Sequence, residues 1–328
     1  MTLVRERRRR RALRLTLPPQ VPLTNFQRRT QLPSPDSPGI VCLSELEKLA
    51  VLGHGNGSTV YQVRHRRTST EYALKVIRFG SDSVALRDQA AREAAILQRI
   101  DSEFVVKCLG VFAGDGDGDG HLSFVLEFMA AGSLQDALWQ QHQLPEPAIA
   151  AMARRVLEGL NYLHGMKIVH GDIKPSNLLI NHKGEIKIAD FGTSQILDDR
   201  VDHTDSYSGT YAYMSPERFD SEKWNGGFSN GFAADVWSLG VVALECHVGR
   251  FPLIGSGQRP DWATLMCAVC FGEKVELPAG MSPEFRSFVW RCLEKDWKKR
   301  GTVSELLSHP FATNCFDSSF SELDGCAM

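Results

Sequence analysis

The sequence predicts an α+β protein with two lobes, a small β-rich lobe followed by a larger and mostly helical one. Short β-type runs separated by Gly-rich or polar turns occupy residues 49–77. A long helical stripe of apolar residues follows at 149–163, and Trp237 to Cys246 is apolar on almost every face, as in a helix buried inside a larger lobe. The expected units are an N-terminal tail (1–44), a small lobe (45–127), a large lobe (128–312) and a C-terminal tail (313–328).

The composition is that of a globular protein, because 43% of the 328 residues are hydrophobic and 23% are charged. No stretch approaches the roughly 18 uncharged apolar residues of a membrane helix. An arginine run occupies the place where a signal peptide would have its apolar segment. We therefore expect a protein of the cytoplasm, with the nucleus as the alternative, and no membrane association. A net charge of −2 argues against nucleic acid as a general partner.

Residues 1–44 are expected to lack regular structure, because prolines punctuate a polar stretch between Leu17 and Gly39. The charge of this tail is strongly positive, since the first forty residues contain nine arginines against only Glu6 and Asp36. The tail therefore offers a basic surface to a partner, whatever the charge of the rest of the chain.

The small lobe is expected to contain an antiparallel sheet and one main helix. The runs Leu49–Leu52, Val60–Val63 and Tyr72–Ile77 predict neighbouring strands of a meander. Apolar residues at helical spacing from about Arg87 to Arg99 predict a helix packed on that sheet. A further β-type run, Phe124–Met129, leads into the large lobe.

The large lobe is expected to begin with a long helix above a hairpin. The residues of the helical stripe are Ile149, Met152, Val156, Leu160 and Leu163. Leu178–Ile180 and Glu185–Ala189, joined by a polar four-residue turn, predict the hairpin.

A glycine-rich hairpin in the small lobe is the first candidate binding element. Its residues are Leu52, Gly53, His54, Gly55, Asn56, Gly57, Ser58, Thr59 and Val60. Such a hairpin is by itself more often only a turn, but its glycines allow backbone amides to approach a polyphosphate without interference from a Cβ. On the next strand Lys75, two residues after Ala73, can reach the phosphates of a nucleotide, and Glu93 on the predicted helix can orient it.

The strongest motif consists of His170–Asn177 followed, after the predicted hairpin, by Asp190–Gly192. Two short loops at this spacing are expected to bring four polar side chains together. The pattern is far more specific than the glycine-rich hairpin alone.

These four side chains suit phosphoryl transfer, in which the protein mainly positions groups and neutralises charge. Asp172 would accept or orient the proton of a substrate hydroxyl, and Lys174 would neutralise charge on the transferred phosphoryl group. Asn177 and Asp190 would hold Mg²⁺, a hard cation that prefers oxygen ligands. The predicted cofactors are therefore ATP and Mg²⁺.

Together with Met214-Ser215-Pro216-Glu217, these motifs resemble the eukaryotic protein kinases over residues 45 to about 312. The resemblance implies the bilobal protein kinase fold. It also implies a hinge from Glu127 to Met129, whose backbone binds adenine, next to Leu126 as gatekeeper, and it places Ala73 among the nucleotide-binding residues.

The same resemblance assigns supporting roles in the large lobe. Asp235 would brace the catalytic loop, and Arg300 would pair with Glu217. Lys174 and Thr210 are typical of kinases directed to Ser and Thr or of dual specificity.

Within the kinases, the segments Val125–Leu134, His170–Asn177 and Tyr211–Asp220 resemble mitogen-activated protein (MAP) kinase kinases, above all the short plant type. This resemblance implies a dual-specificity enzyme that phosphorylates a Thr and a Tyr in the activation loop of a MAP kinase, and an upstream kinase that acts on it. The alternative is a pseudokinase-like scaffold that docks a MAP kinase without phosphorylating it.

Such enzymes hold their substrate through a basic cluster followed by Leu-x-Leu. The tail contains this pattern in Arg9, Arg10 and Arg11 followed by Leu13 and Leu15. An extended segment of this kind would offer charge to an acidic patch and alternate leucines to apolar pockets. A nuclear localisation signal or a nonspecific nucleic-acid patch is the competing interpretation.

The sequence departs from the family at its regulatory positions. The family usually has Arg before the catalytic aspartate, where it binds a phosphate on the activation loop, but Gly171 occupies this position. Plant members usually have two phospho-acceptors six residues apart in that loop. Here Ser206 takes the second place and Arg200 the first, and Arg200 cannot mimic a phosphate because its charge has the opposite sign.

Overall fold

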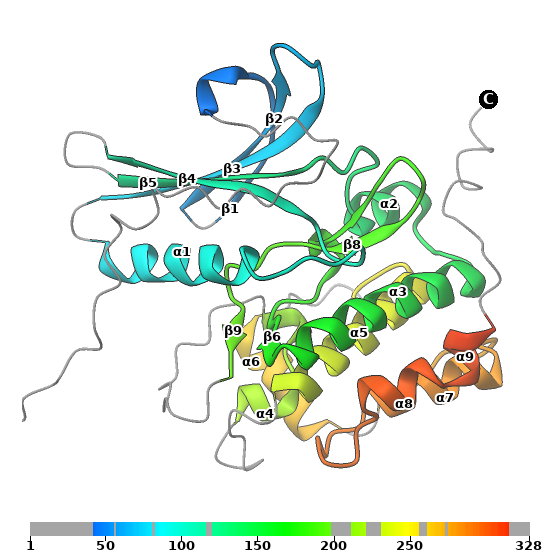
Figure 1. Ribbon diagram of the computed structural model, residues 1–328. Coiled ribbons are helices and arrows are strands. Elements are labelled where there is room, and N and C mark those ends of the chain that lie inside the picture. Colours follow the sequence, from blue (N-terminus) through cyan, green and yellow to red (C-terminus); the bar gives the residue numbers. More distant parts are fainter. Residues whose placement is uncertain are drawn as a thin grey trace, which may run out of the picture.

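The predicted fold class is confirmed by a computed structural model, in which a five-stranded antiparallel sheet precedes a mostly helical lobe (Figure 1). The structure describes residues 42–55, 57–80, 83–115, 120–197, 211–220, 231–255, 261–272 and 275–314. Almost all of the expected N-terminal tail and of the C-terminal tail lies outside these ranges.

The small lobe is built on one sheet with the strand order β1-β2-β3-β5-β4, in which every neighbouring pair is antiparallel. The strands are β1 (Leu46–Gly55), β2 (Ser58–His65), β3 (Glu71–Phe79), β4 (Cys108–Asp115) and β5 (Gly120–Glu127). β3 lies in the middle and buries most of its side chains, as expected of a central strand rich in β-branched and aromatic residues.

Helix α1 (Val84–Leu97) covers one face of this sheet (Figure 1). It buries Ala90, Ala94 and Leu97, so the apolar stripe predicted from the sequence is the face that packs. The helix begins three residues before the predicted start at Arg87.

The large lobe is organised around two long helices, α3 (Glu146–Gly165) and α5 (Gly231–Val248), which contact each other. The other helical segments are α2 (Leu134–Gln141), α4 (Pro216–Phe219), α6 (Trp262–Met266), α7 (Pro283–Cys292), α8 (Val303–Leu307) and α9 (Pro310–Thr313). The five stripe residues of the sequence analysis are all buried on α3. α5 is long and apolar enough to cross a membrane, but 72% of it is buried inside the fold, which makes it a core helix.

Among the described residues, the large lobe also contains four short strands. β7 (Leu178–Ile180) and β8 (Ile186–Ile188) form the predicted hairpin, and β6 (Ile168–Val169) pairs with β9 (Gln195–Ile196). In the hairpin turn, Asn181 accepts hydrogen bonds from the backbone of Lys183 and Glu185 through Oδ1, and Gly184 has φ +74°. This turn chemistry explains why the hairpin could be predicted from four residues.

A buried ion pair fixes the lower part of the large lobe. Arg300 donates from Nη1 and Nη2 to the two carboxylate oxygens of Glu217, at 2.6 and 2.9 Å. Both side chains are almost completely buried, and the paired geometry suits guanidinium and carboxylate. The pair therefore ties α4 to the segment before α8.

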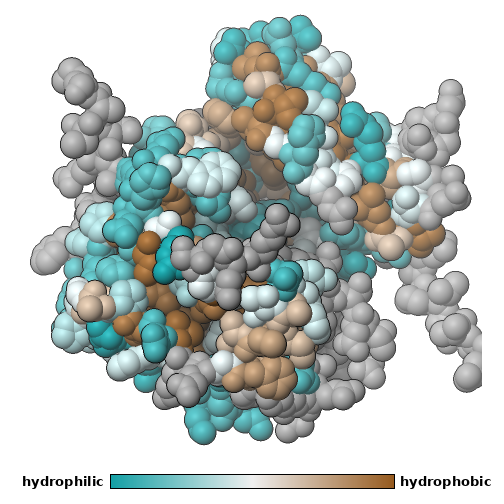
Figure 2. All heavy atoms as spheres, turned by 180° about the vertical axis from the view of Figure 1, so that it is seen from behind, coloured by the Kyte–Doolittle hydropathy of each residue, from teal (hydrophilic) through white to brown (hydrophobic). Residues whose placement is uncertain are grey.

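On the face seen in Figure 2, hydrophilic residues alternate with hydrophobic patches on both lobes. Among the described residues, large exposed side chains include Val51 and Leu52 on β1 and Trp139, Trp262 and Trp290 on the large lobe.

Candidate active site

The glycine-rich hairpin joins β1 to β2, and Asn56 at its tip lies outside the described residues. Gly57 has φ +72°, and a Cβ built there would lie 2.8 Å from the Leu86 side chain of α1. Glycine is therefore favoured at this position by its conformation, and a side chain here would also have to displace the end of Leu86. On β2, Val60 pairs in register with Lys75 of β3, so the hairpin ends beside the candidate phosphate-binding lysine.

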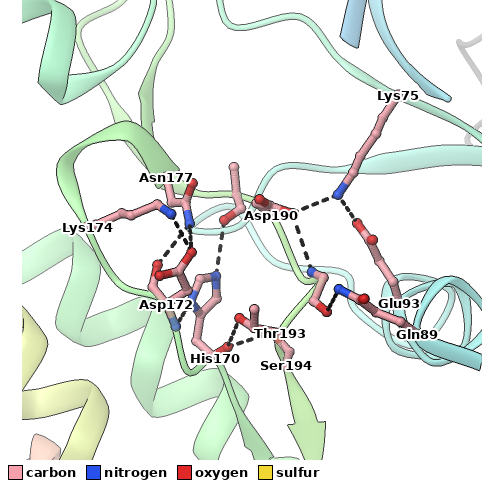
Figure 3. Close-up of polar contacts among 12 residues, drawn as sticks. Lys75, Gln89, Glu93, His170, Asp172, Lys174, Asn177, Asp190, Thr193 and Ser194 are labelled. Carbon is pink, nitrogen blue, oxygen red and sulfur yellow. Dashed lines mark hydrogen bonds and ion pairs between the residues drawn. The ribbon is translucent and has the colours of Figure 1, made fainter. Parts of the chain in front are cut away.

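Lys75 connects the sheet, α1 and the loop that follows β8. Its Nζ lies 2.6 Å from Oε1 of Glu93 and 2.7 Å from Oδ1 of Asp190 (Figure 3). Burial lowers the pKa of the Lys75 amine, but the two carboxylates outweigh burial and hold the pKa above its ordinary value. Lys75 is therefore a cation at physiological pH, even though it is 8% exposed.

The pKa values of the two carboxyl groups around Lys75 shift in opposite directions. Burial raises the pKa of Glu93, which is 2% exposed, whereas Lys75 more than offsets burial at Asp190 and lowers the pKa of that carboxyl. Asp190 is thus the more acidic group, as a ligand of a divalent cation needs to be.

The catalytic-loop residues Asp172, Lys174 and Asn177 also converge (Figure 3). Lys174 Nζ lies 2.6 Å from Oδ2 of Asp172. The amide nitrogen of Asn177 donates to the backbone oxygen of Asp172 at 2.9 Å and to its Oδ2 at 3.1 Å. A carboxylate and a cation therefore lie side by side, as the transfer of a proton and a phosphoryl group would require.

His170 holds this loop from within the core. Its Nδ1 accepts from the backbone N–H of Asp172 at 3.3 Å, so its Nε2 carries the proton and donates to the Ala189 oxygen at 3.1 Å. Its ring meets that of Phe191 edge to face, with centroids 5.1 Å apart. His170 thereby links the catalytic loop to the Asp190 loop.

Asp235, on α5, braces the same loop from below. Its carboxylate accepts from the backbone N–H groups of His170 at 3.0 Å and Gly171 at 2.8 Å, and from His164 Nε2 at 2.9 Å. Burial raises the pKa of Asp235, but its hydrogen bonds with His164 and Gly171 more than offset burial and keep the pKa below its ordinary value.

The donor set fits a hard divalent cation. Because the Asn177 nitrogen is committed to Asp172, its oxygen is the atom left for a ligand. Asp190 has φ +66°, a conformation uncommon outside glycine, which directs its carboxylate toward Lys75 beside the catalytic loop (Figure 3). Oxygen ligands such as those of Asn177 and Asp190 are what Mg²⁺ prefers, so these two side chains would hold the ion.

In the expected hinge, the side chain of Glu127 is occupied by contacts with Lys187 and Lys107. Both carboxylate oxygens accept from Lys187 Nζ at 2.8 Å, and Oε1 also accepts from the Lys107 backbone N–H at 2.6 Å. Any contact of Glu127 with adenine would therefore come from its backbone. Met129 is buried in a small apolar cluster with Ala189, against which Leu126 and Leu179 pack.

Ala73 on β3 pairs in register with Leu126, the residue expected to be the gatekeeper. Leu52, at the other end of the nucleotide-binding set, is 48% exposed on β1.

Several polar residues at this site were not singled out from the sequence. Gln89 of α1, Lys187 of β8 and His164 of α3 each make one of the contacts that hold it, and Arg218 donates from Nη1 to the Gly171 oxygen at 2.6 Å. None of these four residues belongs to a spacing pattern from which a role in the site could be predicted. For His164, a position in the last turn of a helix just before the catalytic loop was the available signal.

Gly171, in the place of the family's arginine, has φ +80°. A Cβ built on it would lie 3.3 Å from the Thr193 oxygen and 3.8 Å from Arg218 Nη1. The regulatory positions Arg200 and Ser206 lie outside the described residues, as do the docking residues Arg9, Arg10, Arg11, Leu13 and Leu15.

A small lobe with a glycine-rich hairpin, a lysine held by a helix glutamate, and a catalytic loop facing an Asp-Phe-Gly loop define a protein kinase. In agreement with this, the family profile described as Protein kinase domain matches residues 46–312.

Comparison with similar proteins identifies the kind of protein kinase. The chain is 54% identical over 316 residues to mitogen-activated protein kinase kinase 10 of Arabidopsis thaliana, covering 96% of this chain and 100% of the relative. It is 50% identical to mitogen-activated protein kinase kinase 9 and 48% identical to mitogen-activated protein kinase kinase 7 of the same plant, covering 95% of this chain and 98% of each relative. The chain belongs to the MAP kinase kinases, within the protein kinase family, and the predicted resemblance is confirmed.

Proposed function

We propose that this kinase is a dual-specificity enzyme that transfers the γ-phosphoryl group of ATP to a Thr and a Tyr in the activation loop of a MAP kinase. The observation that carries the proposal is the joined set Lys75, Glu93 and Asp190, at 2.6 and 2.7 Å, beside the catalytic loop. A scaffold that only docks a MAP kinase has no need for this arrangement of charges.

Each residue has a proposed role in the transfer. Lys75, oriented by Glu93, binds the α and β phosphates, and Asp172 receives the proton of the substrate hydroxyl. Lys174, 2.6 Å from Asp172, neutralises charge on the transferred group. Asn177 and Asp190 would hold Mg²⁺, which would supply positive charge to offset that of the phosphates.

A transfer assay tests the proposal. The purified full-length chain is incubated with MgATP and a MAP kinase whose own catalytic aspartate has been replaced, so that its autophosphorylation is excluded. Phosphate is then mapped by mass spectrometry. We expect Thr and Tyr of the substrate's activation loop to be labelled by the wild type. Binding of the MAP kinase without transfer would favour the scaffold, the alternative suggested by Gly171 and Arg200.

The N-terminal tail is proposed to bind the MAP kinase through Arg9 to Arg11, Leu13 and Leu15. Replacing Leu13 and Leu15 by Ala is expected to raise the KM for the MAP kinase by about tenfold or more, because a docked tail raises the local concentration of substrate. The KM for ATP should not change. Steady-state kinetics against both substrates measures the two effects.

The matched control replaces Leu23 and Leu32, which lie in the same tail outside the Leu-x-Leu pattern. An unchanged KM for the MAP kinase, together with loss of nuclear import, would replace the docking proposal by a localisation signal.

An upstream kinase is expected to phosphorylate the activation loop. We propose that activity depends less on this phosphorylation than in family members that have both phospho-acceptors and an arginine before the catalytic aspartate. A phosphate on Ser206 would lack the charge-assisted hydrogen bonds of an arginine at position 171. If Arg200 bound the phosphate on Ser206 instead, the contact would cost conformational entropy, because both residues belong to the loop that has to be ordered.

The test compares transfer rates of the wild type and Ser206→Ala before and after treatment with an upstream kinase, with Gly171→Arg alongside. Thermal unfolding of Gly171→Arg is measured in parallel, because the positive φ at this position strains an arginine backbone. A large rise in the wild type that is lost in Ser206→Ala and is no greater in Gly171→Arg would show that the phosphate acts without that arginine.

A further inference from the structure

Gln89 makes a contact between two parts of the site that are 103 residues apart. Its side-chain Nε2 donates to the backbone oxygen of Gly192 at 2.7 Å (Figure 3). Gln89 lies on α1, whereas Gly192 closes the Asp190-Phe191-Gly192 motif. The contact therefore joins helix α1 of the small lobe to the loop that carries the proposed metal ligand.

Gln89 and Glu93 are four residues apart on α1 and so project from the same face of the helix. Glu93 reaches the loop indirectly, through Lys75 to Asp190, at 2.6 and 2.7 Å. Gln89 reaches it directly through the carbonyl of Gly192. The helix is thus attached to one loop at two points, one ionic and one neutral.

The surroundings of Gly192 show how closely these groups converge. A Cβ built on Gly192 would lie 3.4 Å from Asp190 Oδ1 and 3.5 Å from both Gln89 Nε2 and Glu93 Oε2. The Gly192 N–H also points to Asp190 Oδ1 at 3.4 Å. Gly192 is therefore held through its carbonyl by Gln89 while its N–H faces the carboxylate of Asp190.

We propose that Gln89 is a positioning residue that keeps α1 against the Asp190 loop, and so maintains both the Lys75–Glu93 pair and the orientation of Asp190. This attachment needs no phosphate. It offers a physical reason for the reduced dependence on loop phosphorylation proposed above. The inference rests on the kinase activity of the site and not on the identity of the protein substrate.

The neutrality of the amide matters, because two carboxylates already lie close to Gly192. Methionine at position 89 would match the length of glutamine but could not donate a hydrogen bond. Glutamate would direct an oxygen at the Gly192 carbonyl and add a third carboxylate beside Glu93 and Asp190. The order of activity should therefore be Gln, then Met, then Glu.

The experiment uses full-length protein with the substitutions Gln89→Met and Gln89→Glu. Gln98→Met is the matched control, since Gln98 is an exposed residue at the end of the same helix. We measure steady-state turnover of MgATP, with kcat and KM determined separately, thermal unfolding, and hydrogen exchange in α1 and in residues 190–192 with and without a nonhydrolysable MgATP analogue.

We expect Gln89→Met to reduce kcat/KM for ATP by about two- to tenfold, the effect of losing one neutral hydrogen bond. Gln89→Glu should lose more, and Gln98→Met nothing. Exchange in α1 and 190–192 should rise together in the Gln89 variants, and the bound analogue should reverse most of that rise, because nucleotide favours the attached state.

Wild-type kinetics and exchange in Gln89→Met would overturn the proposal, as would a loss of activity that simply follows a fall in the thermal unfolding temperature. Failure of the proposed function gives a different result. In that case the wild type would not phosphorylate a MAP kinase, yet the exchange differences between the wild type and Gln89→Met would persist.

Discussion

Asp172→Asn is expected to reduce phosphoryl transfer by a factor of about 10³, within the range that general-base groups contribute, while the protein stays folded. Asparagine keeps the size of the side chain and can still accept the hydrogen bond from the Asn177 amide, now 3.1 Å long. Asparagine cannot accept the substrate proton. Because it is neutral, it also cannot form the ion pair that Asp172 makes with Lys174 Nζ at 2.6 Å. The loss should therefore fall on kcat, with ATP binding close to that of the wild type.

The measurements are single-turnover transfer and ATP affinity by calorimetry. Asp88→Asn is the matched control, because Asp88 is exposed on α1. Transfer by Asp172→Asn at the wild-type rate would show that Asp172 does not take part in the reaction.

Lys75→Met should reduce kcat/KM for ATP by a factor of about 10² to 10³, similar to the loss of other preorganised charge-stabilising groups. The substitution removes the cation at 2.6 Å from Glu93 and 2.7 Å from Asp190, and so leaves two carboxylates facing each other. Burial already raises the pKa of Glu93, and without Lys75 this carboxyl has a stronger tendency to take up a proton or to leave the site with α1.

Unlike Asp172→Asn, this substitution should therefore change both ATP affinity and hydrogen exchange in α1. Lys183→Met, in the exposed turn of the β7–β8 hairpin, is the control. If Lys75→Met bound ATP and transferred phosphate like Lys183→Met, the assignment of Lys75 to the phosphates would be wrong.

The fold could be predicted where one face of an element is buried and the other is not. The stripe on α3 and the hairpin of β7 and β8 are such cases. The start of α1 was placed three residues late because Val84 and Ala85 are exposed and add nothing to the apolar pattern. β4 was not predicted, since Gly110 and Gly114 interrupt it and its register shifts between Cys108 and Gly110.

The candidate site shows the same division. Lys75 and Glu93 could be paired from the sequence because both belong to an ordered set of motifs. Gln89 could not, because a neutral side chain that binds a carbonyl 103 positions away leaves no signal in spacing or charge. Contacts to backbone atoms specify geometry without requiring a particular residue type at the other end, and only the structure shows them.

The backbone at Gly171 has a consequence for how this kinase can change. An ordinary side chain at φ +80° costs about 1 to 2 kcal/mol, and a conventional φ would displace the carbonyl that Arg218 binds at 2.6 Å. Arginine at position 171 would therefore either carry this strain or break the Arg218 hydrogen bond, a loss of stability that a second substitution elsewhere could offset. Residue 171 thus couples the regulation of this kinase to its stability, because restoring the arginine typical of the family costs folding free energy at the same position.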